Sequence, residues 1–180
     1  AASNLDGYIY TAQNAFYHTA ITFVGQNRGA GKNDRVKKSI LLCGLLVSLV
    51  GIVIGMTEVL FGRPLLRLYA PENEAVVEAG MQRLWIMGTT YFLCGLMEVG
   101  SGTLRGIGKS ITPTIIMLSS FVAFRQLFMF CNKLLFAESP FYVYGVSLAY
   151  PSGWILCSIL LIIFYRRSVL FRTPVGAEEQ

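Results

Sequence analysis

The chain has 180 residues, of which 54% are hydrophobic and only 14% are charged, and its mean hydropathy is +0.55. Soluble domains are on average less apolar and about 25% charged, so this composition argues against a soluble domain. The formal net charge of +5 has to be interpreted from where the basic residues lie along the chain.

Five apolar stretches follow one another, and each is close to the ~20 residues that a helix needs to cross a bilayer. Lipid offers the backbone no hydrogen bonds, so an open spanning segment must be a helix. The sequence therefore predicts an all-α, polytopic transmembrane helix bundle. Residues 1–172 form one transmembrane unit and residues 173–180 a cytoplasmic tail. The predicted spans are Leu5–Gly25, Ser39–Phe61, Val77–Gly102, Thr112–Asn132 and Gly145–Tyr165.

Lysine and arginine alternate between dense and sparse loops, and cytoplasmic loops are the ones that retain them. Ten follow the first, third and fifth spans, whereas three follow the second and fourth. This bias predicts a multi-pass protein of the cell membrane with its N-terminus outside and its C-terminus cytoplasmic. The membrane topology explains where the basic residues lie, so the expected partner is the lipid bilayer and not nucleic acid. The ten are Arg28, Lys32, Arg35, Lys37, Lys38, Arg105, Lys109, Arg166, Arg167 and Arg172; the three are Arg63, Arg67 and Lys133.

The first span is the most polar, and its polar side chains share one face. Such a stripe either forms hydrogen bonds that hold a helix bundle together or lines a hydrated pathway. His18 has the same two interpretations, as a packing residue or as a proton carrier. With about 100° of rotation per residue, the stripe contains Asp6, Tyr10, Gln13, Asn14, Tyr17 and His18.

Two ionisable side chains lie deep within predicted spans. Glu98 is about 7 Å from the cytoplasmic end of the third span, and Arg125 is about 20 Å from the same side in the fourth. The axial separation of about 12 Å argues against a direct ion pair. A charge inside a bilayer is costly, so both are candidate functional residues. Alternatively, Glu98 could reach the interface or bond the following turn, and Arg125 could extend outward or pair with a part of the protein outside this chain.

Small residues and cysteines in the spans indicate packing. Gly51 and Gly55 have the spacing that allows close helix contact in membranes. The four cysteines all fall within spans without metal-ligand or redox spacing, so they are expected to be buried hydrophobic residues and no metal site is predicted. Gly108-Lys109-Ser110 looks like the end of a phosphate-binding loop, but Thr103 stands where that loop needs its first glycine.

Two loop sequences resemble the turns of a transporter family. The first runs Phe23-Val24-Gly25-Gln26-Asn27-Arg28-Gly29-Ala30-Gly31, and the second, two spans later, runs Leu104-Arg105-Gly106-Ile107-Gly108-Lys109-Ser110. This pair of turns is similar to those of the multidrug and toxic compound extrusion (MATE) family. The turn residues of the resemblance are Gly25, Gln26, Asn27, Gly29, Arg105, Gly106 and Gly108.

The resemblance implies about twelve helices in two lobes, with this chain as most of the C-terminal lobe and a missing N-terminal lobe as its partner. It implies an exporter that exchanges Na⁺ or H⁺ for small organic, often cationic, compounds by alternating access. No covalent chemistry is implied, and no cofactor beyond the coupling ion. Substrate would bind between the lobes near the midplane of the membrane.

Within this interpretation Glu98 is the predicted residue for cation or proton coupling. Some members of the family have an acidic residue about ten positions before the Leu-Arg-Gly turn, but here that position is Cys94, one helical turn from Glu98. Two alternatives remain open: a lipid-linked oligosaccharide flippase, which would need a more cationic cavity for pyrophosphate, and a non-transporting membrane scaffold or channel subunit. Aromatic faces hold organic cations, and the predicted cavity residues are Tyr10, Asn14, Tyr17, His18 and Tyr91.

Overall fold

The computed structural model describes residues 2–69, 73–139 and 141–170, and almost all of these residues are helical. These ranges contain no strand, so the predicted all-α class is confirmed. The fourth rod of the bundle is continuous but contains a π-helical segment, η1, between two α-helical parts. The helices are α1 (Ala2–Gly29), α2 (Asn33–Tyr69), α3 (Glu74–Gly106), α4 (Ile111–Leu118), η1 (Ser119–Phe124), α5 (Arg125–Phe136) and α6 (Phe141–Leu170).

Each predicted span lies inside one of these rods, which extend beyond it at both ends. Three rods are long and apolar enough to cross a membrane: Asn33–Leu68, Ile111–Phe136 and Phe141–Ser168. The α1 and α3 helices have comparable lengths of 28 and 33 residues, but their polar side chains lower their hydropathy. The predicted tail at 173–180 lies outside the described residues.

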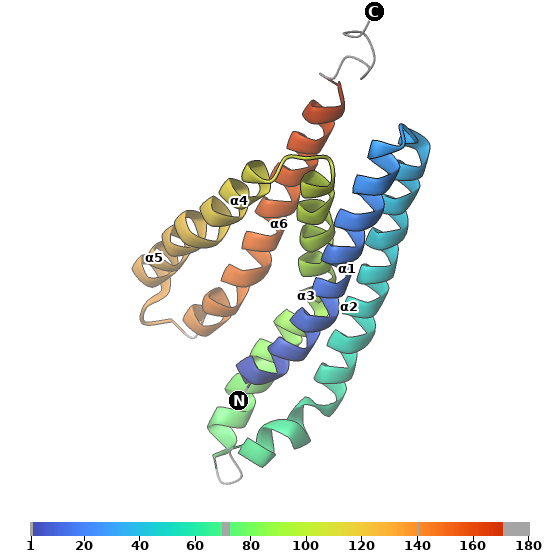
Figure 1. Ribbon diagram of the computed structural model, residues 1–180. Coiled ribbons are helices and arrows are strands. Elements are labelled where there is room, and N and C mark those ends of the chain that lie inside the picture. Colours follow the sequence, from blue (N-terminus) through green and yellow to red (C-terminus); the bar gives the residue numbers. More distant parts are fainter. Residues whose placement is uncertain (1, 70–72, 140, 171–180) are drawn as a thin grey trace, which may run out of the picture.

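The end of α2 differs from the sequence prediction. The second span was predicted to end at Phe61, and Pro64 follows three residues later, but the helix continues to Tyr69 with Pro64 inside. An interior proline removes one backbone hydrogen bond and bends the helix instead of always stopping it. Figure 1 shows the last turns of α2 swinging toward the start of α3. An exposed ion pair, Arg67–Glu74, with a nitrogen–oxygen distance of 3.2 Å, joins the two helices there.

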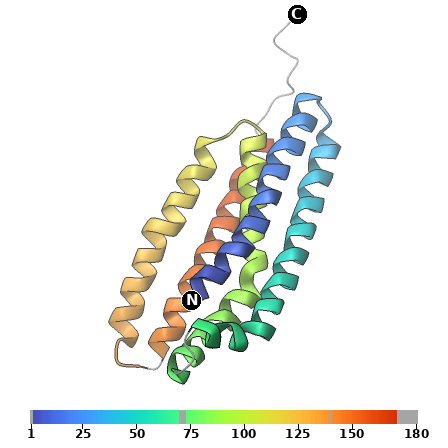
Figure 2. The ribbon, with the colours of Figure 1, turned by 60° about the horizontal axis from the view of Figure 1, so that its bottom comes forward.

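The α3 helix is the centre of the bundle, because it packs against α1, α2 and α6. Figures 1 and 2 show α1 and α2 as an antiparallel hairpin beside it, with the α4–α5 rod next to α6. The main hydrophobic cluster accordingly combines α3 residues such as Leu104 with α6 residues such as Trp154 and Leu161. A site that faces α3 is therefore surrounded by several helices.

Glycines bring α3 into backbone contact with its neighbours. A Cβ atom added at Gly55 of α2 would lie 2.1 Å from the carbonyl oxygen of Gly88 in α3. On the other side, a Cβ atom at Gly102 would lie 2.6 Å from the carbonyl oxygen of Tyr17 in α1. The close helix contact predicted for Gly51 and Gly55 is confirmed. Van der Waals packing of this kind is a main attraction between helices in lipid.

Large apolar side chains cover the outward surfaces of α2, α5 and α6. Leu60 and Leu134 are each 74% exposed, and many similar residues surround them. So much exposed apolar surface suits acyl chains and not water. Three of the four cysteines are buried as predicted, but Cys131 is exposed, because it lies on the outward side of α5.

Candidate functional site

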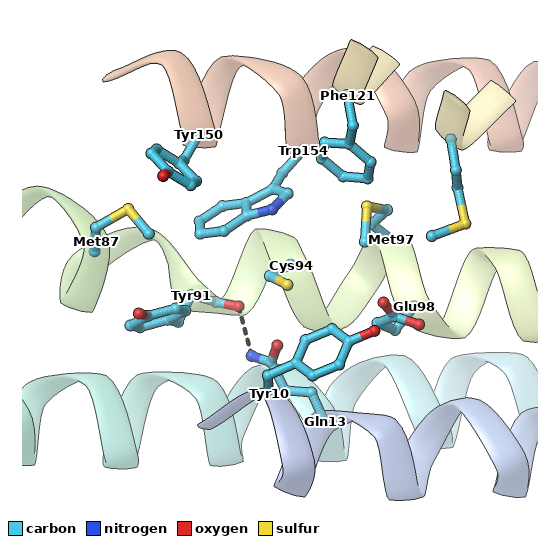
Figure 3. A pocket seen from close by; sticks show the side chains of 11 residues that line it. Tyr10, Gln13, Met87, Tyr91, Cys94, Met97, Glu98, Phe121, Tyr150 and Trp154 are labelled. Carbon is cyan, nitrogen blue, oxygen red and sulfur yellow. Dashed lines mark hydrogen bonds between the residues drawn. The ribbon is translucent and has the colours of Figure 1, made fainter. Parts of the chain in front are cut away.

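A pocket of about 310 Å³ opens between α1, α3, α6 and the α4–η1 segment, as Figure 3 shows. Its volume is at the lower end of the range for small-molecule sites, about 300–1,000 Å³. Most of its wall is aromatic rings and methionine side chains, and the wall contains a single carboxylate. The lining residues are Tyr10, Gln13, Met87, Tyr91, Cys94, Met97, Glu98, Met117, Phe121, Tyr150 and Trp154.

One face of α3 forms the floor of the pocket. Met87, Tyr91, Cys94 and Glu98 succeed one another at steps of four, three and four residues. This spacing aligns side chains along a single side of an α-helix. The floor is therefore apolar at Met87 and ends, about 16 Å further along the helix axis, at the carboxylate of Glu98.

Glu98 is 3% exposed, although it is the only carboxylate of the pocket wall. Its Oε1 atom has no hydrogen-bond partner among the described residues. Figure 3 shows the phenol oxygen of Tyr10, from α1, directed toward this carboxylate. A buried carboxylate with unsatisfied hydrogen-bonding capacity is costly unless it holds a proton or a cation.

A buried amide fixes α1 against α3 at Tyr91, two helical turns before Glu98. Gln13 is fully buried, and its Nε2 atom donates a hydrogen bond of 2.8 Å to the backbone oxygen of Tyr91. The ring of Tyr91 packs against that of Trp154 from α6, with 5.7 Å between ring centroids. Three helices thus hold the aromatic side chains of the pocket in defined positions.

The pocket includes Tyr10, Tyr91 and Glu98, but Asn14, Tyr17 and His18 lie outside its lining. The stripe on α1 is wider than the pocket: with Tyr10 as reference, Gln13 is rotated about 60° to one side, and Asn14 and His18 about 40° and 80° to the other. Asn14 is accordingly half-buried and His18 exposed.

Tyr17 points in nearly the same direction as Tyr10 but lies about 10 Å closer to the α1–α2 turn. There its ring is 5.9 Å from the guanidinium of Arg105 and packs edge-on against His18, with 5.0 Å between centroids. Arg105 also donates a hydrogen bond of 2.9 Å to the hydroxyl of Thr114. Tyr17 therefore belongs to a polar contact between α1, α3 and α4, outside the pocket.

Arg125 stacks on a ring of the pocket wall. Its guanidinium carbon lies 3.8 Å from the centroid of the Tyr150 ring, and that of Arg83 lies 5.4 Å from the same centroid. No ion pair joins Arg125 to Glu98 or to any other described carboxylate. Glu98 thus lines the pocket, whereas Arg125 contacts one ring of its wall from outside the lining, and the two charges do not pair.

The two family-like turns pack against each other at one end of the bundle. Gly25, Gln26, Asn27 and Gly29 were expected in a turn but form the last turns of α1, because the helix continues to Gly29. A Cβ atom at Gly106 would lie 3.0 Å from the carbonyl oxygen of Ile21, so the glycine permits this crossing. The chain reverses direction at Gly31 and Gly108, whose φ angles of 69° and 85° favour glycine.

Sequence reasoning missed most of the apolar wall of the pocket. Met87, Tyr91, Cys94 and Glu98 follow an i, i+4, i+7, i+11 pattern that is visible in the sequence. Tyr91 and Glu98 were already predicted site residues, so this pattern could have identified the other two. Gln13 belonged to the polar stripe but was not selected from it. Nothing in the sequence distinguished the pocket-lining residues of α4, η1 and α6, because aromatic and methionine residues are common throughout the spans.

The fold and the pocket define a polytopic membrane protein with a central, largely aromatic pocket. A model of the MatE family matches residues 1–130, which is most of the chain. The chain therefore belongs to this family, and the resemblance that its two turns showed is confirmed.

Two curated relatives agree with this assignment. The chain is 28% identical over 99 residues to "Probable multidrug resistance protein NorM" of Thermotoga maritima, a match that covers 55% of this chain and 21% of the relative. It is 26% identical over 147 residues to "Probable multidrug resistance protein YoeA" of Bacillus subtilis, covering 80% and 30%. The chain thus spans less than a third of the length of either relative. No solved structure matches it.

Proposed function

We propose that this chain is part of a secondary active exporter that exchanges Na⁺ or H⁺ for organic, often cationic, compounds by alternating access. The names of the two relatives support the transported class. The observation that carries the proposal is the buried Glu98 carboxylate in the wall of an aromatic pocket. Aromatic faces and a carboxylate are the groups that attract an organic cation in a low-dielectric site.

Exchange follows from the presence of a single carboxylate. Glu98 has to be neutralised inside the bilayer, and a proton, a Na⁺ ion or a cationic substrate would each do this. These ligands exclude one another because they need the same oxygens. Binding of the coupling ion would therefore release the substrate, and binding of substrate would displace the ion. Glu98 here takes the role of the family's acidic position, which is Cys94 in this chain and lies one turn away in the same pocket.

The orientation of the chain is part of the proposal. The α1–α2 turn, the α3–α4 turn and the end of α6 lie at the same end of the bundle in Figure 1. Nine of the ten basic residues of the dense loops belong to these three segments, and Arg172 lies outside the described residues. The positive-inside rule then makes this end cytoplasmic and the N-terminus of the chain external.

The pocket favours the exporter over a flippase of pyrophosphate-linked lipids. Its lining contains one carboxylate and neither lysine nor arginine. A pyrophosphate carries several negative charges and requires basic donors in the wall itself. An aromatic wall with one carboxylate favours cations over anions.

Transport by the full-length protein tests the proposal. Purified protein in liposomes is given an imposed Na⁺ or proton gradient, and movement of the fluorescent cation ethidium is measured. Wild type should transport ethidium under one of the two gradients. Glu98→Gln keeps the shape of the side chain but cannot be ionised, so it should lower the rate at least tenfold while membrane insertion is unchanged.

Glu78→Gln is the matched control, because Glu78 is half-exposed and only pairs with Arg63 at the surface. It should transport like wild type. Normal, ion-dependent transport by Glu98→Gln would make Glu98 a structural residue. Absence of transport by wild type under both gradients would favour a scaffold or channel subunit.

A further inference from the structure

The outward face of α2 carries a straight row of two basic and three apolar side chains. Arg35, Lys38, Leu42, Leu45 and Leu49 follow one another at steps of three and four residues, and all five are exposed. At 100° per residue they lie within a sector of about 80°. The buried residues in this half of the helix point to the opposite side, toward α1 and α3, which are the helices that α2 contacts among the described residues (Figures 1 and 2). The five residues are called the α2 row below.

The α2 row matches one leaflet of a bilayer in length. From Lys38 to Leu49 it extends about 16 Å along the helix axis, close to half of the hydrocarbon thickness of about 30 Å. Its three leucines are each more than half exposed, so an acyl chain can lie along them. The two basic side chains then lie at the level of the lipid headgroups.

The basic residues at the two ends of α2 differ in their partners. Near the C-terminal end, Arg63 and Arg67 each form an ion pair with a glutamate at the start of α3. Near the N-terminal end, neither Arg35 nor Lys38 forms an ion pair with any carboxylate of the described residues. Asp34 is exposed in the first turn, where the helix N-terminus favours an acidic side chain, and it pairs with neither of them. The two cations of the α2 row are therefore available to an anion from outside the chain.

Membrane topology alone does not explain this placement. The positive-inside rule concerns the number of basic residues in a loop, and basic side chains on any face of α2 would satisfy it. A lysine or arginine at a membrane surface attracts anionic headgroups and strengthens their association about fivefold. Two such residues above a row of exposed leucines combine this attraction with contact to an acyl chain of the same lipid.

We propose that the α2 row binds an anionic glycerophospholipid, with its phosphate between Arg35 and Lys38 and one acyl chain along the leucines. Arg35 offers a planar pair of N–H donors to two phosphate oxygens, and Lys38 adds a compact ammonium group. In the orientation proposed above, this lipid belongs to the cytoplasmic leaflet. The inference does not depend on export of cations, because it requires only that α2 crosses the membrane.

Competition binding to the purified full-length protein tests the site. Radiolabelled dioleoylphosphatidylglycerol is bound to the protein in neutral detergent and displaced by unlabelled phosphatidylglycerol, by phosphatidylcholine with the same acyl chains, or by glycerol phosphate. Wild type should prefer phosphatidylglycerol to phosphatidylcholine at least tenfold, because only the former has a net negative charge. Equal affinity for the two lipids would overturn the site. Displacement by glycerol phosphate as effective as that by the lipid would show a site for free phosphate and overturn the lipid.

Two double variants locate the preference on the protein. Arg35→Gln with Lys38→Gln should weaken phosphatidylglycerol about tenfold and leave phosphatidylcholine unchanged. Arg166→Gln with Arg167→Gln is the matched control, because it removes the same charge from exposed residues at the same end of the bundle but on α6. The control should bind phosphatidylglycerol like wild type. Equal weakening by both double variants would show a diffuse attraction to the positive end and overturn the site, as would unchanged binding by the first. The lipid preference of wild type tests the proposal without requiring any variant to fold.

Discussion

The contact between Gly55 and Gly88 makes a quantitative prediction about the bundle. The Cβ atom of Gly55→Ala would lie 2.1 Å from the carbonyl oxygen of Gly88, whereas ordinary contacts begin at 3.4 Å. Both groups are fixed by helical backbone, so α2 and α3 must move apart by about 1.3 Å. Roughly thirty atom pairs of α2 and α3 face each other, and each contributes about 0.15 kcal/mol of dispersion energy. Losing half of this attraction costs about 2 kcal/mol.

The assay compares Gly55→Ala with Gly44→Ala in the full-length protein. Gly44 lies on the same helix and also faces α3, but its Cβ atom would meet Leu96 at an ordinary 3.6 Å. Thermal stability in detergent, measured by loss of the monodisperse peak in size-exclusion chromatography, should fall clearly for Gly55→Ala. Gly44→Ala should match or slightly exceed wild type, because alanine favours helix. Equal apparent Tm values for the two variants would refute backbone contact at Gly55.

Two further predictions concern topology and the buried amide. Single cysteines introduced at Asn33 and Asn73 report on opposite ends of the bundle: an impermeant thiol reagent should label position 73 but not position 33 in intact cells, and the reverse pattern would invert the proposed orientation. Gln13→Leu removes the hydrogen bond to Tyr91 but also removes Oε1, which has no partner among the described residues, so thermal unfolding should show a change of about 1 kcal/mol or less. Gln13→Ala adds a cavity and should cost about 2 kcal/mol more than Gln13→Leu, and equal costs would contradict close packing at this position.

The helices were predictable because their signal is local. A run of about twenty apolar residues leaves the backbone no alternative to a helix in lipid, and each predicted span does fall inside a helix. The end of α2 was misjudged, since a proline such as Pro64 can either end or bend a helix, and the outcome depends on the contacts that the next residues make. Here the ion pair Arg67–Glu74 and the packing of Leu66 against Val77 support a continued helix.

The polar face of α1 was only partly predictable. Periodicity identifies a face about 100° or more in width, but a pocket uses a narrower sector of it. Gln13 and His18 belong to the same stripe, yet Gln13 is fully buried and His18 exposed. The difference arises from the Gly102 contact with Tyr17, which brings one edge of the stripe against α3. Such a crossing depends on two helices, so neither helix alone reveals it.

Glu98 and Arg125 illustrate the same limit for charges. Along the helix axes they are about 12 Å apart. This separation argued against an ion pair, but it did not show where the two residues lie across the bundle. Their relation runs across the bundle, through the Tyr150 ring of α6 and the π-segment that turns Arg125 toward it. Such a relation depends on how α3, α5 and α6 pack against one another, so the sequence of no single helix reveals it.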